Sequence, residues 1–226
     1  YRQICKQVGR ETNLFPCFMP KPFMGVSANG CHHNISLWAG DQNKFMPEGD
    51  NPRMPGKVGL QAIAGMMEHL EALTCITAPT VNSYRRLWDA GFWAPLFADW
   101  GFQNRTTALR VSAPGRFEYR SVDSAVNPYL SHAILIAACD DGLANAIDPG
   151  EPTVGSSYDS EQDARFPALP LTLGEAIDAF EADPFLRTVL GQELSELLVE
   201  FKKDEWARFC GFVTDWEKST YWDDTP

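Results

Sequence analysis

The sequence predicts an α+β fold with an antiparallel sheet. Two stretches, 106–112 and 116–122, alternate polar and apolar residues as half-buried strands do. Apolar residues recur at helical steps over 60–73, and a nearly all-apolar helix is predicted at 129–139. A strand, a helix, strands and then helices follow one another, which favours segregated helices over repeated βα units. The 226 residues suffice for one large domain or two small ones.

Local signals predict the elements of the first third of the chain. Helical spacing of apolar residues predicts a helix over 1–11, and 29–38 is predicted as a strand. The Pro-rich stretch 42–57 is predicted as a loop. The apolar face over 60–73 predicts one long helix, which Ala78-Pro79-Thr80 ends.

The later elements are bounded by stronger signals. Asn127-Pro128 is an N-cap followed by proline at the first helical position, so a helix begins there. Residues 144–171, rich in Pro, Gly, Ser and Asp, are predicted as a long surface loop of a functional or mobile kind. C-terminal helices are predicted over 172–226, the first opened by a capping box at Thr172 and the last spanning 193–216.

The composition excludes several classes of partner. Acidic residues outnumber basic ones by 30 to 19, so the formal net charge is −11. Nucleic acids and anionic membranes both attract basic proteins, and neither partner is expected. No apolar run approaches the about 18 residues of a membrane-spanning helix, and the first residues contain no signal-peptide core. Six irregularly spaced cysteines without a C-x-x-C pair indicate reduced thiols and a cytoplasmic protein.

The predicted strand 29–38 has one polar face. His32, Asn34 and Ser36 point one way, whereas the alternate residues form a mostly apolar face on which His33 is the exception. Such a polar face is able to bind a ligand. An ordinary half-solvated strand explains the pattern at least as well, because a lone His is seldom a metal ligand.

Arginines concentrate in one part of this acidic chain. Six lie in the 36 residues from Arg85 to Arg120: Arg85, Arg86, Arg105, Arg110, Arg116 and Arg120. Clustered like charges repel unless an anion lies among them, and guanidinium groups fit carboxylate and phosphate oxygens. The alternative is a solvated sheet face with cross-strand ion pairs.

A His and a Glu on neighbouring predicted strands accompany these arginines. His32 and Glu118 suit Mg²⁺ or Mn²⁺ together with a polyphosphate. The sequence contains no P-loop, no dinucleotide-binding fingerprint and no nucleophile elbow. A nucleotide bound here would therefore lie on an open sheet face lined with arginines.

Five motifs follow one another in order over more than 100 residues. They are Ser27-Ala28-Asn29-Gly30-Cys31-His32-His33-Asn34-Ile35-Ser36-Leu37, Asn82-Ser83-Tyr84-Arg85-Arg86-Leu87, Asn104 to Arg110, Arg116-Phe117-Glu118-Tyr119-Arg120 and Asn127-Pro128-Tyr129-Leu130. Together they resemble the C-terminal catalytic part of glutamine synthetases and related glutamate–amine ligases. The resemblance covers nearly the whole chain. It implies one catalytic domain over 1–226, with a curved antiparallel sheet flanked by helices and the family's N-terminal part absent.

The resemblance also implies a reaction and a set of site residues. The family makes γ-glutamyl phosphate from ATP and glutamate, and an amine nitrogen then attacks the acyl phosphate. Mg²⁺ or Mn²⁺ is the implied cofactor, with His32 and Glu118 as its ligands. The implied ATP contacts are Asn34, Ser36, Arg105, Arg110 and Arg116, of which Arg105 is also catalytic because it stabilises phosphoryl transfer. The implied glutamate contacts are Ser27, Ala28, Arg86 and Arg120.

One departure from the family pattern concerns the amine. Ammonia-using members carry Gly-Tyr-Glu-Ala-Pro where this chain has Gly91-Phe92-Trp93-Ala94-Pro95. A carboxylate suits a small cation, whereas an indole suits an organic amine through packing or cation–π contact. Phe92 and Trp88 add aromatic surface nearby. Alternatively, Trp93 merely packs a loop.

A second departure concerns the rest of the enzyme. The family's N-terminal domain, and the strands that carry most of its metal-binding glutamates, lie upstream of these motifs. We therefore expect this chain to be the later part of a longer enzyme that does not catalyse alone. A ring-shaped homo-oligomer with intersubunit active sites is also expected. The predicted activity is a glutamate–amine ligase; the alternatives are a glutamate–ammonia ligase and a catalytically inactive structural or regulatory member.

Overall fold

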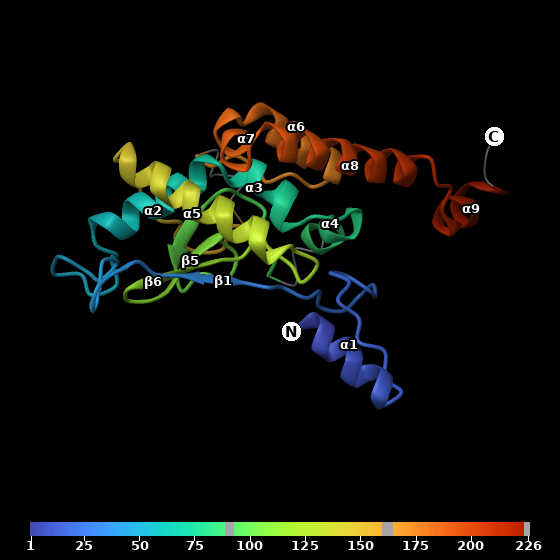
Figure 1. Ribbon diagram of the computed structural model, residues 1–226, viewed down its shortest axis with the longest axis horizontal. Coiled ribbons are helices and arrows are strands. Elements are labelled where there is room, and N and C mark those ends of the chain that lie inside the picture. Colours follow the sequence, from blue (N-terminus) through green and yellow to red (C-terminus); the bar gives the residue numbers. More distant parts are fainter. Residues whose placement is uncertain (89–92, 160–164, 224–226) are drawn as a thin grey trace.

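A four-stranded sheet lies at the centre of the computed structural model, which describes residues 1–88, 93–159 and 165–223 (Figure 1). In spatial order the strands are β1 (His33–Ile35), β6 (Arg116–Tyr119), β5 (Leu109–Ala113) and β4 (Trp100–Phe102). The β1–β6 and β6–β5 pairs are antiparallel, as predicted, but β4 runs parallel to β5. The sheet is therefore mixed rather than antiparallel throughout. The pattern does not predict β4 because three residues are too few to show alternation.

Helices cover one side of this sheet in two layers (Figure 1). The inner layer contains α2 (Lys57–Glu68), α3 (Leu70–Thr77) and α5 (Pro128–Ala144), and the outer layer α6 (Leu173–Ala182), α7 (Pro184–Leu190) and α8 (Gln192–Cys210). The remaining elements are α1 (Arg2–Glu11), the β2–β3 pair (Trp38–Ala39 and Gln42–Asn43), α4 (Val81–Leu87) and α9 (Asp215–Tyr221). Along the part of the chain described, no helix combines the length and apolar character that spanning a membrane requires.

The sequence signals for helix starts are confirmed. The Asn127 side chain accepts a hydrogen bond from the Tyr129 backbone N–H, at 3.0 Å, and Thr172 accepts one from Glu175, at 3.1 Å. These contacts satisfy backbone donors that the first turn of a helix leaves unpaired.

Several predicted elements are shorter than expected. The strand predicted over 106–112 begins only at Leu109, as β5, and the one predicted over 116–122 ends at Tyr119, as β6. Strand β1 contains only three of the residues in 29–38. The single helix predicted over 60–77 is interrupted at His69, and that predicted over 193–216 ends at Cys210, before a capping box at Thr214 starts α9. Apolar spacing continues across the break at His69 because α2 and α3 share one core, so periodicity alone does not reveal that break. Helix α9 buries no residue, so it does not extend the apolar face of α8 into the core.

The packing of α2 against α5 decides which sheet face is left for a site. A Cβ on Gly65 would lie 2.1 Å from the Ala138 carbonyl oxygen, and one on Gly142 would lie 2.0 Å from that of Gln61. The two helices therefore approach closely, and the core that they share with the sheet contains Phe117, which is 1% exposed. Since side chains alternate along a strand, the next residue, Glu118, points to the opposite face.

His69, at the break between α2 and α3, carries a pH-dependent contact. Its Nδ1 lies 2.6 Å from Asp183 Oδ2, and its Nε2 lies 3.4 Å from Asp141 Oδ2. Burial would lower the pKa of His69, but the hydrogen bonds and charges of both aspartates outweigh it and raise that pKa. For Asp183 the effects have the opposite signs. Burial would raise the pKa of Asp183, but the hydrogen bond from His69 is the main cause that lowers that pKa instead.

We expect the free energy of unfolding to fall as the pH rises through the pKa of His69. A raised histidine pKa stabilises the fold fully below its unfolded value of about 6.5, and the contribution disappears as pH rises through the folded pKa. The urea midpoint of the wild type should therefore drop between pH 6 and 8.5 by more than that of His69→Gln. Equal drops in the two proteins would contradict this expectation.

Candidate active site

Nine residues from widely separated parts of the chain line one cavity of about 350 Å³. They are Ala28, Gly30, His32, Arg86, Trp93, Arg105, Arg110, Glu118 and Arg120. Arg110 comes from β5, Glu118 from β6 and Arg86 from α4, and the others come from the segments between elements. The cavity thus opens on the sheet face that the inner helices leave uncovered. Four of its residues are arginines, so it suits an anionic ligand.

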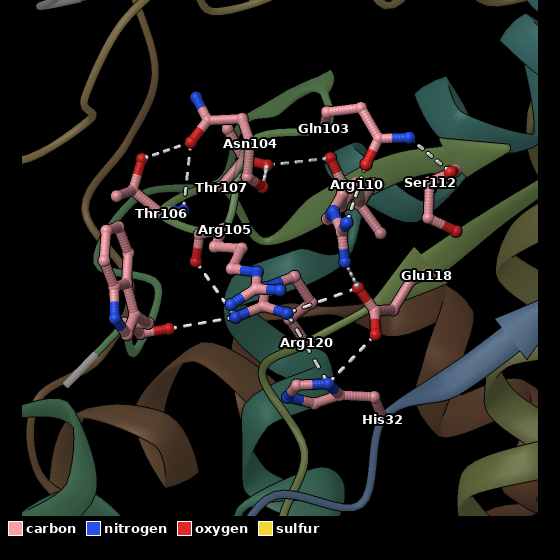
Figure 2. A network of polar contacts seen from close by, with 12 residues as sticks. His32, Gln103, Asn104, Arg105, Thr106, Thr107, Arg110, Ser112, Glu118 and Arg120 are labelled. Carbon is pink, nitrogen blue, oxygen red and sulfur yellow. Dashed lines mark hydrogen bonds and ion pairs between the residues drawn. The ribbon is translucent and has the colours of Figure 1, made fainter. Parts of the chain in front are cut away.

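Glu118 is the centre of the polar network in this cavity (Figure 2). Its Oε1 lies 3.0 Å from His32 Nδ1, and its Oε2 accepts hydrogen bonds from Arg110 Nη1 and Arg120 Nη1, both at 3.2 Å. The residue is 9% exposed. The predicted neighbourhood of His32, Glu118 and the arginines is therefore confirmed.

The electrostatics keep the carboxylate charged and the imidazole neutral. Burial would raise the pKa of Glu118, but His32 and Arg120 outweigh this effect and lower it. Burial, helped by the charge of Arg120, lowers the pKa of His32 to about 4. At neutral pH the pair is thus a carboxylate beside a neutral imidazole, the protonation state that metal ligation requires.

Backbone carbonyls hold Arg120 in place. Its Nη2 donates to the Trp93 carbonyl oxygen, at 3.1 Å. It also donates to the Arg105 carbonyl oxygen, at 2.9 Å, as Figure 2 shows. Arg86 is buried behind it and donates from Nη2 to the Arg120 carbonyl oxygen, at 2.9 Å. The buried Nε atoms of Arg110 and Arg120 have no hydrogen-bond partner within the described residues. Both guanidinium groups therefore keep donor capacity.

Four predicted site residues lie outside this cavity. Asn34 and Ser36 line a neighbouring cavity of about 540 Å³ between β1 and α5, which shares only His32 with the first. Ser27 and Arg116 are exposed and line neither cavity. The cavity thus groups the predicted metal ligands with most of the predicted glutamate contacts and most of the arginines, but not with Ser27, Ser36 or Arg116. Asn34 lines the neighbouring cavity, although it pairs with Glu118 across β1 and β6 and so shares the sheet face of Glu118.

The predicted aromatic surroundings of Trp93 are only partly present. Trp93 is 54% exposed and lines the cavity. Trp88 lies instead in a small groove with Trp206 and Phe209, and its Nε1 donates to the Leu171 carbonyl oxygen at 2.9 Å. Phe92 lies outside the described residues.

Sequence reasoning missed the part that backbone geometry plays here. Trp93 has φ 66°, in the left-handed region that non-glycine residues rarely adopt, and this turn carries the carbonyl that binds Arg120. A Cβ on Gly30 would lie 2.8 Å from His32 Nε2, so a larger residue there would require the imidazole to shift. The glycine two residues before His32 is visible in the sequence motif. The orientation of the Trp93 carbonyl group, in contrast, leaves no signal in the sequence.

The donor set fits part of a metal site. Within the described ranges, no group of three or more His, Cys, Asp and Glu residues is placed to hold a metal ion. One imidazole and one carboxylate 3.0 Å apart fit two ligands of a Mg²⁺ or Mn²⁺ ion.

Comparison with known families agrees with this fold. The family model described as "Glutamine synthetase, catalytic domain" matches residues 1–221. The chain therefore belongs to the glutamine synthetase family, as its motifs indicate.

Individual relatives add detail. The chain is 39% identical to the glutamine synthetase of Rhizobium meliloti (strain 1021) over 97% of its own length and 52% of the relative's. The apo structure of GmaS has 34% identity and a TM-score of 0.89, covering 98% of this chain and 51% of that one. The GmaS/ADP complex has 35% identity and a TM-score of 0.90, covering 98% and 52%. The chain thus spans about half the length of the relatives it matches.

Proposed function

We propose that this chain is the catalytic domain of an ATP-dependent ligase that joins the γ-carboxyl group of glutamate to an organic amine. The supporting observation is the convergence of four arginines, His32 and Glu118 in one cavity. In the proposed reaction the γ-carboxylate attacks the terminal phosphorus of ATP and ADP leaves. The amine nitrogen then attacks the acyl carbon, and inorganic phosphate and a proton leave.

The arginines divide into two roles in this proposal. Arg105, exposed at the cavity, and Arg110 bind the transferred phosphoryl group, and Arg105 stabilises the charge that develops during transfer. Arg86 and Arg120 bind glutamate carboxylates, together with the backbone at Ser27 and Ala28. Buried guanidinium groups suit this task because their bidentate hydrogen bonds gain strength away from water.

The cofactor is Mg²⁺ or Mn²⁺, held by His32 and Glu118 together with ligands from elsewhere in the protein. When bound, it supplies a positive charge that neutralises the phosphate oxygens. Asn34, Ser36 and Arg116 contact ATP in the proposal, and the GmaS/ADP complex supports a nucleotide as co-substrate for this fold. We also propose a cytoplasmic homo-oligomer, ring-shaped and with sites between subunits.

The choice of an organic amine depends on Trp93. Its indole lines the cavity where the family's ammonia-using members carry a glutamate, and it is free to stack on an alkylammonium group. The second candidate is a glutamate–ammonia ligase, which the names of the curated relatives favour. Both candidates predict that the full-length protein releases ADP from ATP only when glutamate and a nitrogen donor are present. Glutamate-independent release, or none, would contradict both.

Trp93→Glu is expected to shift the enzyme toward ammonia. A carboxylate attracts a small cation and removes the aromatic face, so the ratio of kcat/KM for ammonia to that for the best organic amine should rise about tenfold. Trp93→Phe, which keeps an aromatic ring, is the matched control. The role of the indole would be contradicted if both variants changed the ratio equally.

A further inference from the structure

A stretch distant in sequence lies beside the cavity and is anchored on a buried carboxylate. Thr153–Tyr158, hereafter the anchor segment, belongs to the predicted surface loop 144–171, yet Thr153 and Ser157 are only 6% and 1% exposed. Asp99 Oδ2 accepts hydrogen bonds from Ser157 Oγ, at 2.6 Å, and from Thr153 Oγ1, at 3.1 Å. A buried carboxylate is costly unless such donors satisfy it, and the proposed reaction does not use Asp99.

The anchor segment holds both neighbours of Arg105. The Ser157 backbone N–H donates to Thr106 Oγ1 at 2.9 Å, and Asn104 Nδ2 donates to the Gly155 carbonyl oxygen at 2.7 Å. Asp99 contributes again from the other side, because its Oδ1 accepts from the Ala108 backbone N–H at 3.0 Å. The backbone of Arg105 is thus fixed on both sides, although its side chain stays exposed.

The same segment also holds the turn that contains Trp93. Tyr158 donates its hydroxyl hydrogen to the Ala94 carbonyl oxygen at 2.7 Å. Trp93, immediately before Ala94, has the left-handed backbone conformation described above, which neighbouring contacts must maintain. The tyrosine hydroxyl supplies one such contact.

These two attachments meet at Arg120. Its Nη2 atom donates to the Trp93 and Arg105 carbonyl oxygens, and the anchor segment binds a residue next to each of them. We propose that the anchor segment, fixed on Asp99, is a positioning element that sets the orientation of the Arg120 guanidinium. Asp99, Ser157 and Tyr158 are positioning residues, since they act through the carbonyls. The ligand of Arg120, glutamate, rests on the function proposed above.

The test uses the full-length enzyme with Ser157→Ala, Tyr158→Phe and the double variant. Ser157→Ala removes the hydrogen bonds of its hydroxyl with Asp99 and Thr106, and Tyr158→Phe removes the one to Ala94. Each single change should raise KM for glutamate by about three- to tenfold. Tyr158→Phe should leave kcat and KM for ATP within about twofold, because its contact lies on the Trp93 side only. Direct calorimetric titration with glutamate should show the same loss of affinity.

Ser195→Ala is the matched control. Ser195 is also a serine that is 1% exposed, and its hydroxyl donates to the Gln192 carbonyl oxygen at 3.0 Å within α8. It should lower the melting temperature as Ser157→Ala does without changing KM for glutamate. A double variant whose KM for glutamate equals that of Ser195→Ala would overturn the proposal.

A second measurement separates this proposal from the function it rests on. If wild-type enzyme neither binds glutamate nor releases ADP, the proposed function fails. Amide hydrogen exchange of residues 93, 94 and 104–107 then tests the anchor alone. Faster exchange there in the double variant than in Ser195→Ala supports the positioning element, and equal exchange overturns it.

Discussion

Arg105→Ala is expected to lower the kcat of the full-length enzyme by about a thousandfold or more, the usual effect of removing an arginine that stabilises phosphoryl transfer. The guanidinium is exposed at the cavity, so its loss leaves the fold unchanged. The carbonyl oxygen of residue 105, which binds Arg120, stays in the alanine variant. The effect should therefore fall on kcat, with KM for glutamate altered by less than about threefold.

The control for this loss is Arg53→Ala. Arg53 is another exposed arginine, in the 42–57 stretch, and it does not line the proposed site. It should leave kcat and the urea midpoint unchanged, and Arg105→Lys should recover part of the activity because it keeps the charge. A kcat for Arg105→Ala within tenfold of the wild type would contradict the assigned role.

Glu118→Ala is expected to abolish activity and also to weaken the fold. The side chains of Arg110 and Arg120 are only 18% and 6% exposed, and they share the Glu118 carboxylate. Removing one partner of buried charges leaves the others uncompensated, which costs about 3 kcal/mol of the free energy of unfolding. Urea unfolding at pH 7 measures this loss, and Mn²⁺ titration should show that metal affinity is lost as well.

Glu118→Gln separates the two effects. The amide keeps the size of the side chain and one oxygen acceptor, so it should recover much of the stability but little metal affinity. If Glu118→Ala unfolded at the wild-type urea concentration, the carboxylate would not hold the arginines. If it bound Mn²⁺ as the wild type does, Glu118 would not be a metal ligand.

Much of the site was predictable because strand alternation and charge act locally. Alternation in 116–120 places the Glu118 and Phe117 side chains on opposite faces of the sheet. The structure confirms this, since Phe117 is buried in the core while Glu118 lines the cavity. The clustering of arginines in an acidic chain correctly indicated a common location for four of the six, whereas Arg85 and Arg116 lie elsewhere. Helix starts at Asn127 and Thr172 were predictable for the same reason, because capping depends on residues only two or three positions apart.

The parts that were not predictable depend on distant contacts. The positions of Asn34 and Ser36 in a separate cavity depend on how α5 packs beside β1, which no local pattern encodes. The anchor segment was predicted only as a surface loop, because its buried contacts with Asp99 join residues more than 50 positions apart. Even the parallel strand β4 follows from tertiary pairing, since its own three residues carry no periodic signal.

The rate of ADP release by the full-length enzyme with different nitrogen donors tests the central proposal most directly. The assay compares ammonia with alkylamines, arylamines and polyamines at saturating ATP, glutamate and Mg²⁺. The proposal predicts that at least one organic amine, stacked on Trp93, supports faster turnover than ammonia. Faster turnover with ammonia than with every amine would contradict it and favour a glutamate–ammonia ligase.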